Sequence, residues 1–276
     1  MKKIFSTSLL ILLMSSLIIY GWGDKGHKTI TAFAMKYLPA EMKFSMEFKK
    51  AITDHSVDPD NRKRDDKSEG PKHFIDIDYY KEFMDGIVIK SRDTLNQLYS
   101  EEVVTKQGIL PWATEETFYK LVNAFKEKNK DNILLYASDL AHYVGDGHQP
   151  LHATVNYNGQ LTSQKGIHAR YEIMMVDNYL NVIENSFEEH KPFYVKNVQD
   201  YIFDYIVESN DYVEMILSAD KYASDKTSGK FDKEYYRLLW FKTKYVTINE
   251  INSAALCLSS LIYSAWVDAG KPILEN

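Results

Sequence analysis

Apolar residues recur at the three- and four-residue spacing of an α-helix along most of this chain, and that periodicity narrows the possible folds more than any other feature. In EETFYKLVNAFKEK the positions are Phe118, Leu121, Val122 and Phe125, which share one helical face. The same spacing recurs in the segments HKTITAFAMKYLP, DNILLYASDLAHYVGD, VQDYIFDYIVE, DYVEMILSAD, EYYRLLWFKTKYV and INSAALCLSSLIYSAWVDAG. The only strand candidate is the short run GIVIK. The sequence therefore predicts a single compact multi-helix domain of the all-α class, with polar loops at 56–73 and 156–166.

The first 21 residues have the layout of a secretory signal peptide. They read MKKIFSTSLLILLMSSLIIYG, with two lysines, an apolar run and a small residue at Gly21. We expect cleavage after Gly21 and export of residues 22–276 as one domain, to a periplasm or to the outside of the cell. An uncleaved signal anchor is the alternative, because Ile19-Tyr20-Gly21 matches a small-x-small cleavage site only partly.

Charge and cysteine content limit the chemistry of the exported part. With Lys2 and Lys3 removed, 31 basic side chains face 39 acidic ones, a balance of −8. An acidic protein is poorly suited to following a long nucleic-acid backbone by charge alone. Cys257 is the only cysteine, so no intramolecular disulfide forms. Any bound metal would therefore need His, Asp, Glu or backbone ligands.

Three of the eight histidines fall within the eleven residues HYVGDGHQPLH. His142 and Asp146 stand four apart on a predicted helix, so both project from one face. The turn that follows can bring His152 back toward that face. Zinc binds imidazole nitrogen and carboxylate oxygen at about 2 Å, and this spacing suits it. Such pairs also occur as ordinary helix-stabilising contacts, so the motif alone does not establish a site. We expect His148, which lies in the turn, on the surface.

A second pair has the same arrangement. In GIHARYE, His168 and Glu172 stand at i and i+4, which again presents two ligands on one helical face. With His152 they make a three-ligand site that leaves a position for water or substrate, as catalytic zinc requires.

Two further elements contribute candidate ligands. Asp60 and His73 flank a basic loop. In WGDKGH, cleavage before Trp22 would free an α-amino group, which together with the Trp22 carbonyl and His27 could chelate another metal. An ordinary tryptophan after a signal peptide accounts for the same residue.

The ordered set of these features resembles one superfamily. An N-terminal Trp with a nearby His, an Asp before HFID, the HYVGDGHQPLH motif and a downstream HxxxE are similar to the ligand series of the trinuclear-zinc superfamily, which contains bacterial phospholipase C and the single-strand nucleases of the P-one and S-one type. The resemblance extends from Trp22 to about Trp266. It implies an all-α domain with a trinuclear zinc cleft, hence three Zn²⁺ ions per chain. The implied ligands are Asp60, His73, His142 and Asp146 for the first zinc; His152, His168 and Glu172 for the second; and the Trp22 amine and carbonyl, His27 and a shared Asp146 for the third.

The resemblance also implies a mechanism. Zinc ions close together activate water as hydroxide for attack on a phosphodiester. Asp60 is the candidate catalytic residue, a carboxylate that orients the nucleophile or takes its proton. VDPD offers both Asp58 and Asp60 as the early ligand, and its Pro-Asp context resembles the phospholipase form, which favours Asp60. Arg62 and Lys63 either contact the phosphate or form a solvated loop. Phe74 either stacks on the substrate or packs.

The sequence features that bear on the substrate are divided between the nuclease and phospholipase branches of the superfamily. The short interval from Trp22 to His27 and the HFIDID stretch resemble the nucleases. The short interval from His152 to His168 and the GIHARYE ending resemble the phospholipases. We favour an exported zinc-dependent phosphodiesterase of the phospholipase C type. The alternative is a single-strand-specific endonuclease and 3′-nucleotidase, and the second alternative is a zinc-binding protein without catalysis. Phospholipid or single-stranded nucleic acid is the expected substrate, no protein partner is implied, and the oligomeric state stays open.

Overall fold

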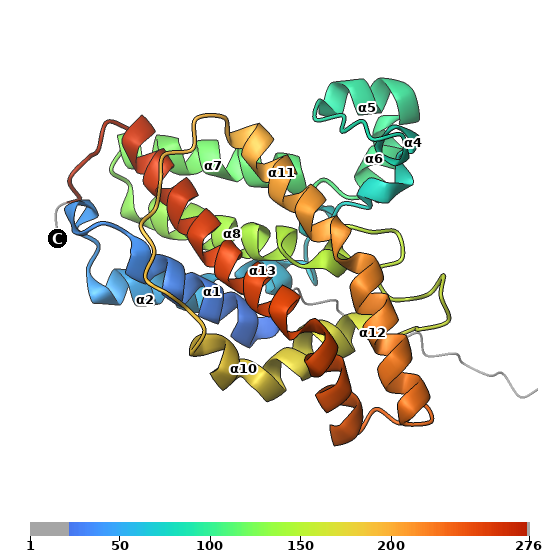
Figure 1. The fold of residues 1–276 in the computed structure, drawn as a ribbon. Coiled ribbons are helices and arrows are strands. Elements are labelled where there is room, and N and C mark those ends of the chain that lie inside the picture. The colour runs from blue at the N-terminus through green and yellow to red at the C-terminus, as the bar shows by residue number, and fades with distance from the viewer. Residues whose placement is uncertain (1–21, 275–276) are drawn as a thin grey trace, which may run out of the picture.

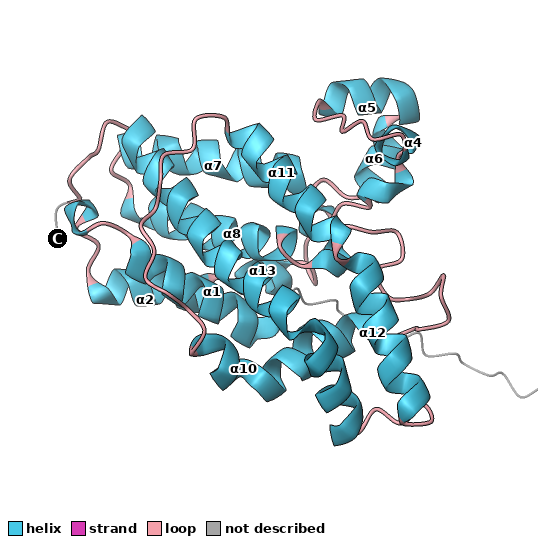
Figure 2. Cartoon of the chain, in the orientation of Figure 1, coloured by secondary structure: helices cyan, strands magenta, loops and turns pink. Residues whose placement is uncertain are grey.

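The computed structural model describes residues 22–274, and within that range helices and loops make up the whole backbone (Figures 1 and 2). The all-α prediction is confirmed. The predicted signal peptide, residues 1–21, lies outside the described residues. The longer helices are α1 (Gly23–Tyr37), α2 (Met46–His55), α7 (Leu110–Lys126), α8 (Lys130–Gly147), α10 (Val176–Glu184), α11 (Val198–Asp211), α12 (Val213–Lys226) and α13 (Lys233–Asp268).

Shorter elements connect these helices and carry much of the chemistry described below. They are the α-helical turns α3 (Asp58–Arg62), α4 (Lys81–Met84), α5 (Arg92–Tyr99), α6 (Glu101–Lys106) and α9 (Ile167–Ala169), the 3₁₀ turns η1 (Ala40–Met42), η2 (Gly70–His73), η3 (Ile77–Tyr79) and η4 (Pro150–His152), and the π-helical turn η5 (Arg170–Met175). The predicted loop 156–166 is confirmed as irregular, whereas the predicted loop 56–73 contains α3 and η2. Pro59 in the first turn of α3 favours helix there, because its fixed φ suits that position.

Helix α8 lies at the centre of the bundle and packs against α1, α2, α7 and α13 (Figure 1). Its apolar residues Ile133, Ala137, Leu140 and Ala141 are fully buried, as the periodicity predicted, whereas Leu134 and Tyr136, which it also predicted to be buried, are only partly so. Helix α13 runs for 36 residues and joins two segments that the sequence patterns presented separately. The two join because no glycine or proline interrupts the chain between them. Helices α4, α5 and α6 form a corner at one end of the bundle (Figure 1).

The strand candidate from the sequence does not form a strand. GIVIK, residues 86–90, adopts a turn and loop, and no strand is present anywhere in the described chain to pair with it. Gly86, with φ of +81°, opens this segment as part of a turn.

Across residues 22–274, no helix combines the length and the apolar character that spanning a bilayer demands.

The carboxyl group of Glu250 on α13 provides a test of how tightly this helix is buried. Its side chain is 2% exposed, and Oε2 has no hydrogen-bond partner in the described structure. Burial, assisted by the charge of Glu208, raises the pKa of Glu250 to about 8. The folded state therefore binds more protons than the unfolded state between the ordinary carboxyl pKa and pH 8, so stability falls as pH rises through that window. We expect Glu250→Gln to flatten this dependence and to be more stable at pH 8, by on the order of a few kcal/mol.

Urea unfolding of both proteins at pH 5 and pH 8 measures the difference. Glu234→Gln is the matched control, because that carboxylate is exposed and paired with Arg237. Equal pH dependence in the wild type and Glu250→Gln would contradict the assignment.

Candidate metal centre

Four of the predicted ligands converge where α3, η2 and α8 meet, and we call them the first cluster: Asp60, His73, His142 and Asp146. All four are buried. His142 Nε2 lies 2.9 Å from His73 Nδ1, 3.5 Å from Asp60 Oδ1 and 3.2 Å from Asp146 Oδ2. His73 Nδ1 lies 2.9 Å from Asp146 Oδ2 and 3.6 Å from Asp60 Oδ1. A tetrahedral zinc with ligands at about 2.0–2.1 Å separates its donors by about 3.3 Å, so these spacings fit one ion.

The two histidines of the first cluster are oriented from outside it. His142 Nδ1 lies 2.8 Å from the Ser56 carbonyl, to which it donates, so Nε2 points into the cluster. His73 turns Nδ1 inward and Nε2 toward Glu69, whose Oε1 is 3.7 Å away. Tyr143 donates its hydroxyl hydrogen to that same Glu69 oxygen. Partners of this kind fix ring orientation at metal sites.

Three further predicted ligands, His152, His168 and Glu172, form a second cluster. His152 Nε2 lies 3.1 Å from His168 Nε2 and 3.4 Å from Glu172 Oε2, and His168 Nε2 lies 2.9 Å from the same carboxylate oxygen. His152 Nδ1 donates to the His73 carbonyl at 2.6 Å, and His168 Nδ1 donates to the Tyr157 carbonyl at 3.1 Å. Three protein donors leave room for a further ligand, which is the arrangement of catalytic zinc sites.

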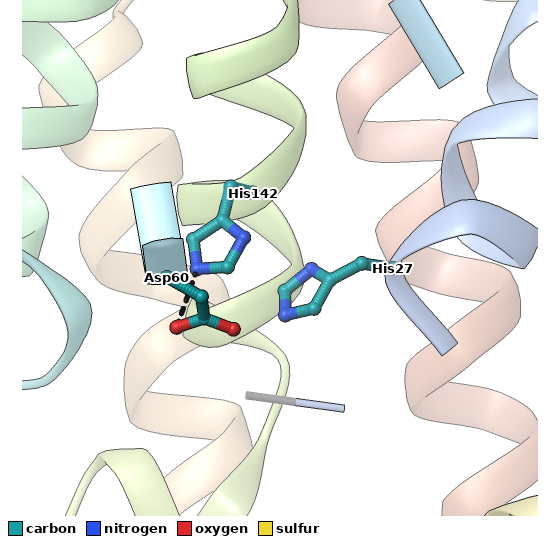
Figure 3. Close-up of side chains that lie close together, drawn as sticks. All are labelled: His27, Asp60 and His142. Atoms are coloured by element: carbon teal, nitrogen blue, oxygen red, sulfur yellow. Dashed lines mark ion pairs between the residues drawn. The ribbon is translucent and has the colours of Figure 1, made fainter. Parts of the chain in front are cut away.

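His27 on α1 reaches the first cluster from the opposite side. Its ring stacks on that of His142, with centroids 4.1 Å apart, and the two rings lie beside the Asp60 carboxylate (Figure 3). Its Nε2 lies 3.4 Å from Asp146 Oδ1. A side chain at Gly145 would place Cβ 2.7 Å from His27 Nδ1, so glycine at this position of α8 allows α1 to approach. Trp22 is fully buried at the start of α1.

Asp146 connects these groups through its two oxygens. Oδ2 faces the first cluster, while Oδ1 faces His27 and also lies 3.4 Å from His152 Nδ1. Burial alone would raise the pKa of Asp146, but His142 and His152 hold it well below its usual range. In turn, although burial opposes its charge, Asp146 and Asp60 raise the pKa of His142 to about 10. Metal binding would displace that proton, so metal and protons compete for the same nitrogen.

Several buried polar atoms around the clusters have no hydrogen-bond partner in the described structure. They are both ring nitrogens of His27, both carboxylate oxygens of Asp60, His73 Nε2, Asp146 Oδ1 and Glu172 Oε1. An unsatisfied buried polar atom costs about 1–3 kcal/mol, so folds rarely concentrate them without a ligand. Imidazole nitrogens and carboxylate oxygens at these spacings fit zinc.

A cleft of about 800 Å³ opens over both clusters. His73 from the first cluster and His152 and His168 from the second form part of its wall. The remaining lining residues are the basic Lys63, Arg64 and Lys106, the aromatic Phe74 and Tyr157, and Gly70, Pro71, Asp76, Gln107 and Leu151. Phe74 thus lines the cleft, and so does Lys63, whose Nζ lies 2.5 Å from Asp60 Oδ1. Arg62 is instead held by Asp139 at 2.9 Å and Glu69 at 3.3 Å.

Of the two aspartates in VDPD, Asp60 lies in the first cluster and Asp58 does not. Asp58 is half-buried, and its Oδ2 lies 2.7 Å from His55 Nδ1. The expectation that His148 lies on the surface was wrong. His148 is 2% exposed, because its ring stacks on Tyr205 of α11, and burial lowers its pKa to about 4.

Two supporting residues were missed in the sequence. Gln149 donates to Glu172 Oε2 at 2.8 Å, and Glu69 faces His73. Glu69 stands four residues before His73, which is a helical spacing, and this spacing is the signal that points to it. Gln149 lies inside the histidine-rich motif itself.

The comparisons with known proteins agree with this geometry. A model of the S1/P1 Nuclease family matches residues 22–241, a range that includes both clusters and His27. A comparison with curated proteins found no match.

Proposed function

The chain belongs to the S1/P1 nuclease family, and from that premise we propose that it is an exported zinc-dependent enzyme that cleaves single-stranded nucleic acid. Membership makes it a metal-dependent hydrolase of the phosphodiesterase type. The observation that carries the finer proposal is the cleft, where histidines of both clusters share one wall with aromatic and basic side chains.

The residues of the cleft suit a nucleotide chain. Phe74 and Tyr157 offer faces on which bases stack, and stacking supports binding of single strands without sequence readout. Arg64 and Lys106 place positive charge where the phosphates would pass, while the Lys63 ammonium group beside them pairs with Asp60. The chain is acidic overall, so this local charge, together with the metals, would supply the attraction to phosphate. A cleft of about 800 Å³ lies within the range of small-ligand sites.

We assign the zinc ligands as the family resemblance implies them, with the first cluster holding one ion, the second cluster another, and Trp22, His27 and Asp146 the third. When bound, zinc supplies a nucleophile at neutral pH by acidifying water and offsets charge on the phosphate oxygens. Burial opposes ionisation of Asp60, but His142 and Lys63 hold its pKa well below the usual range. Asp60 therefore stays an anion, and in this proposal it orients the nucleophile by accepting a hydrogen bond.

The third set of ligands, formed by Trp22, His27 and Asp146, depends on where the mature chain begins. Only cleavage before Trp22 gives that residue a free amine, and the buried position of Trp22 at the start of α1, the helix that carries His27, supports the assignment. N-terminal sequencing of the exported protein tests it. A chain that keeps residues 1–21 would lack the third set.

Phospholipid is the second candidate substrate, supported by the short interval from His152 to His168 and by glutamate at position 172. These features led the sequence analysis toward phospholipase C. The family match and the aromatic cleft now favour the nuclease.

One parallel assay separates the candidates. Purified mature protein is offered single-stranded DNA, duplex DNA and phosphatidylcholine, at mildly acidic and neutral pH, with and without a chelator. We expect chelator-sensitive cleavage of the single strand. Release of phosphorylcholine in its place would establish the phospholipase, and bound zinc without turnover of any substrate would leave a zinc-binding protein.

Phe74 provides a test of the base-stacking part of the proposal. Phe74→Leu keeps an apolar side chain but removes the aromatic face. Stacking contributes about 1–3 kcal/mol per base, so we expect KM for single-stranded DNA to rise roughly 5- to 150-fold with a smaller change in kcat. Phe241→Leu, at an exposed position on α13, is the matched control. An unchanged KM would show that Phe74 only packs.

A further inference from the structure

Arg170 lies in η5 between two ligands of the second cluster, two residues from His168 and two from Glu172. We propose that Arg170 is a positioning residue: a buried clamp that fixes the second cluster and the wall of the cleft beside it. The inference rests on the proposed function only in that it takes the second cluster to be a metal site.

One half of the clamp attaches Arg170 to the helices behind the site. The side chain is buried, and its Nη2 and Nε lie 2.9 Å and 3.3 Å from Asp220 Oδ1 on α12. Nε also donates to the Tyr235 hydroxyl on α13 at 2.9 Å, and Tyr235 donates to the same Asp220 oxygen. The guanidinium lies over the Phe231 ring, 4.0 Å from its centroid. The ion pair is thus enclosed by hydrogen bonds and an aromatic face.

The other half attaches Arg170 to the loop 156–166. Nη1 donates to the Lys165 carbonyl at 3.0 Å, and Nη2 donates to the Gln164 carbonyl at 3.1 Å. Gln164 closes the connection, because its Nε2 donates to Asp220 Oδ2 and to the Leu217 carbonyl, each at 2.7 Å. Gly166 has φ of +94°, and a Cβ there would lie 2.8 Å from Arg170 Nη1. Both the backbone and the space at this position therefore require glycine.

The loop connects the clamp to the chemistry. Tyr157, near its start, lines the cleft, and its carbonyl accepts the hydrogen bond that orients His168. His168 and Glu172 are held on the same backbone segment as Arg170. The clamp therefore acts on two of the three donors of the second cluster, while the hydrogen bonds of the Arg170 guanidinium run to α12, α13 and the loop. Lysine cannot replace it, since an ammonium group lacks the planar fork that reaches Asp220 and two carbonyls together.

Zinc titration of the variants tests the clamp without any substrate. For Arg170→Lys and Arg170→Gln, we expect zinc affinity at the second cluster to fall about 10- to 100-fold, as loss of supporting partners does at other metal sites, and affinity at the first cluster to stay within error. Faster proteolysis of loop 156–166 in the zinc-free protein is the second expected result. Arg237→Gln is the matched control, because its pair with Glu234 is exposed.

Gln164→Ala keeps the proposal testable if the arginine variants fail to fold, since it weakens only the loop half and buries no unpaired charge. We expect the same changes in smaller measure. Wild-type zinc affinity and wild-type proteolysis in Gln164→Ala would overturn the clamp, as would equal loss of zinc from both clusters in the arginine variants. Proteolysis reports on the clamp even if the wild type cleaves no phosphodiester or binds no zinc, so failure of the proposed function is distinguished from failure of this inference.

Discussion

Replacing Asp146 with asparagine is expected to lower chelator-sensitive phosphodiester cleavage by at least about 10³-fold while leaving helical content largely unchanged. Asp146 faces all parts of the centre, with Oδ2 toward His73 and His142 and Oδ1 toward His27 and His152. Asparagine keeps the shape but removes the charge that two metals would share. Metal-ion catalysis contributes several kcal/mol, and about 4 kcal/mol corresponds to 10³ in rate.

The measurement combines kcat/KM on single-stranded DNA with metal content and circular dichroism. Asp225→Asn is the matched control, because that aspartate is exposed and pairs with the exposed Lys221. Glu172→Gln is the informative comparison, since Glu172 belongs to the second cluster alone and its loss should remove one metal where Asp146→Asn affects two. Full activity of Asp146→Asn would remove this residue from the ligand set.

The ligand pairs that residue spacing alone predicted are the ones with local geometry, whereas Trp22, His27, Asp60 and His73 came from the family resemblance. His142 and Asp146, and likewise His168 and Glu172, stand four residues apart, and helical spacing alone brings each pair to within 3.2 Å. The helices themselves follow from the same periodicity, which depends on neighbours within one turn. Even the π-helical turn η5 preserves the second pair, although no pattern in the sequence predicted that turn.

The parts that residue spacing alone could not place depend on contacts between distant segments. His27 meets Asp146 only because α1 packs on α8 at Gly145, and a glycine within a helical pattern does not by itself indicate which helix approaches it. His148 is buried because α11 brings Tyr205 against it.

The sequence also does not predict which basic side chains of the loop 56–73 face the cleft. Arg62 turns to Asp139 while its neighbour Lys63 faces the cleft, and the short helix α3 decides between them. The family resemblance supplied the ligand order, but it carried no signal for Glu69 or for the Arg170 clamp.

Removing bound metal with a chelator is expected to lower the melting temperature by roughly 8–16 °C. A ligand that binds only the folded state at 1,000 times its Kd adds about 4 kcal/mol, and for a domain of this size each kcal/mol shifts Tm by about 2–4 °C. A bound metal would also interact with buried nitrogen and oxygen atoms of His27, Asp146 and Glu172 that have no hydrogen-bond partner in the described structure. Thermal unfolding with chelator, and again after zinc is restored, measures the shift, which Asp146→Asn should reduce. An identical Tm for the untreated protein, the protein with chelator and the protein with zinc restored would mean that the folded chain binds no metal. Because protons compete with metal for the same imidazole nitrogens, lowering the pH should shrink the chelator effect, whereas a general action of the chelator on the fold would not depend on pH in this way.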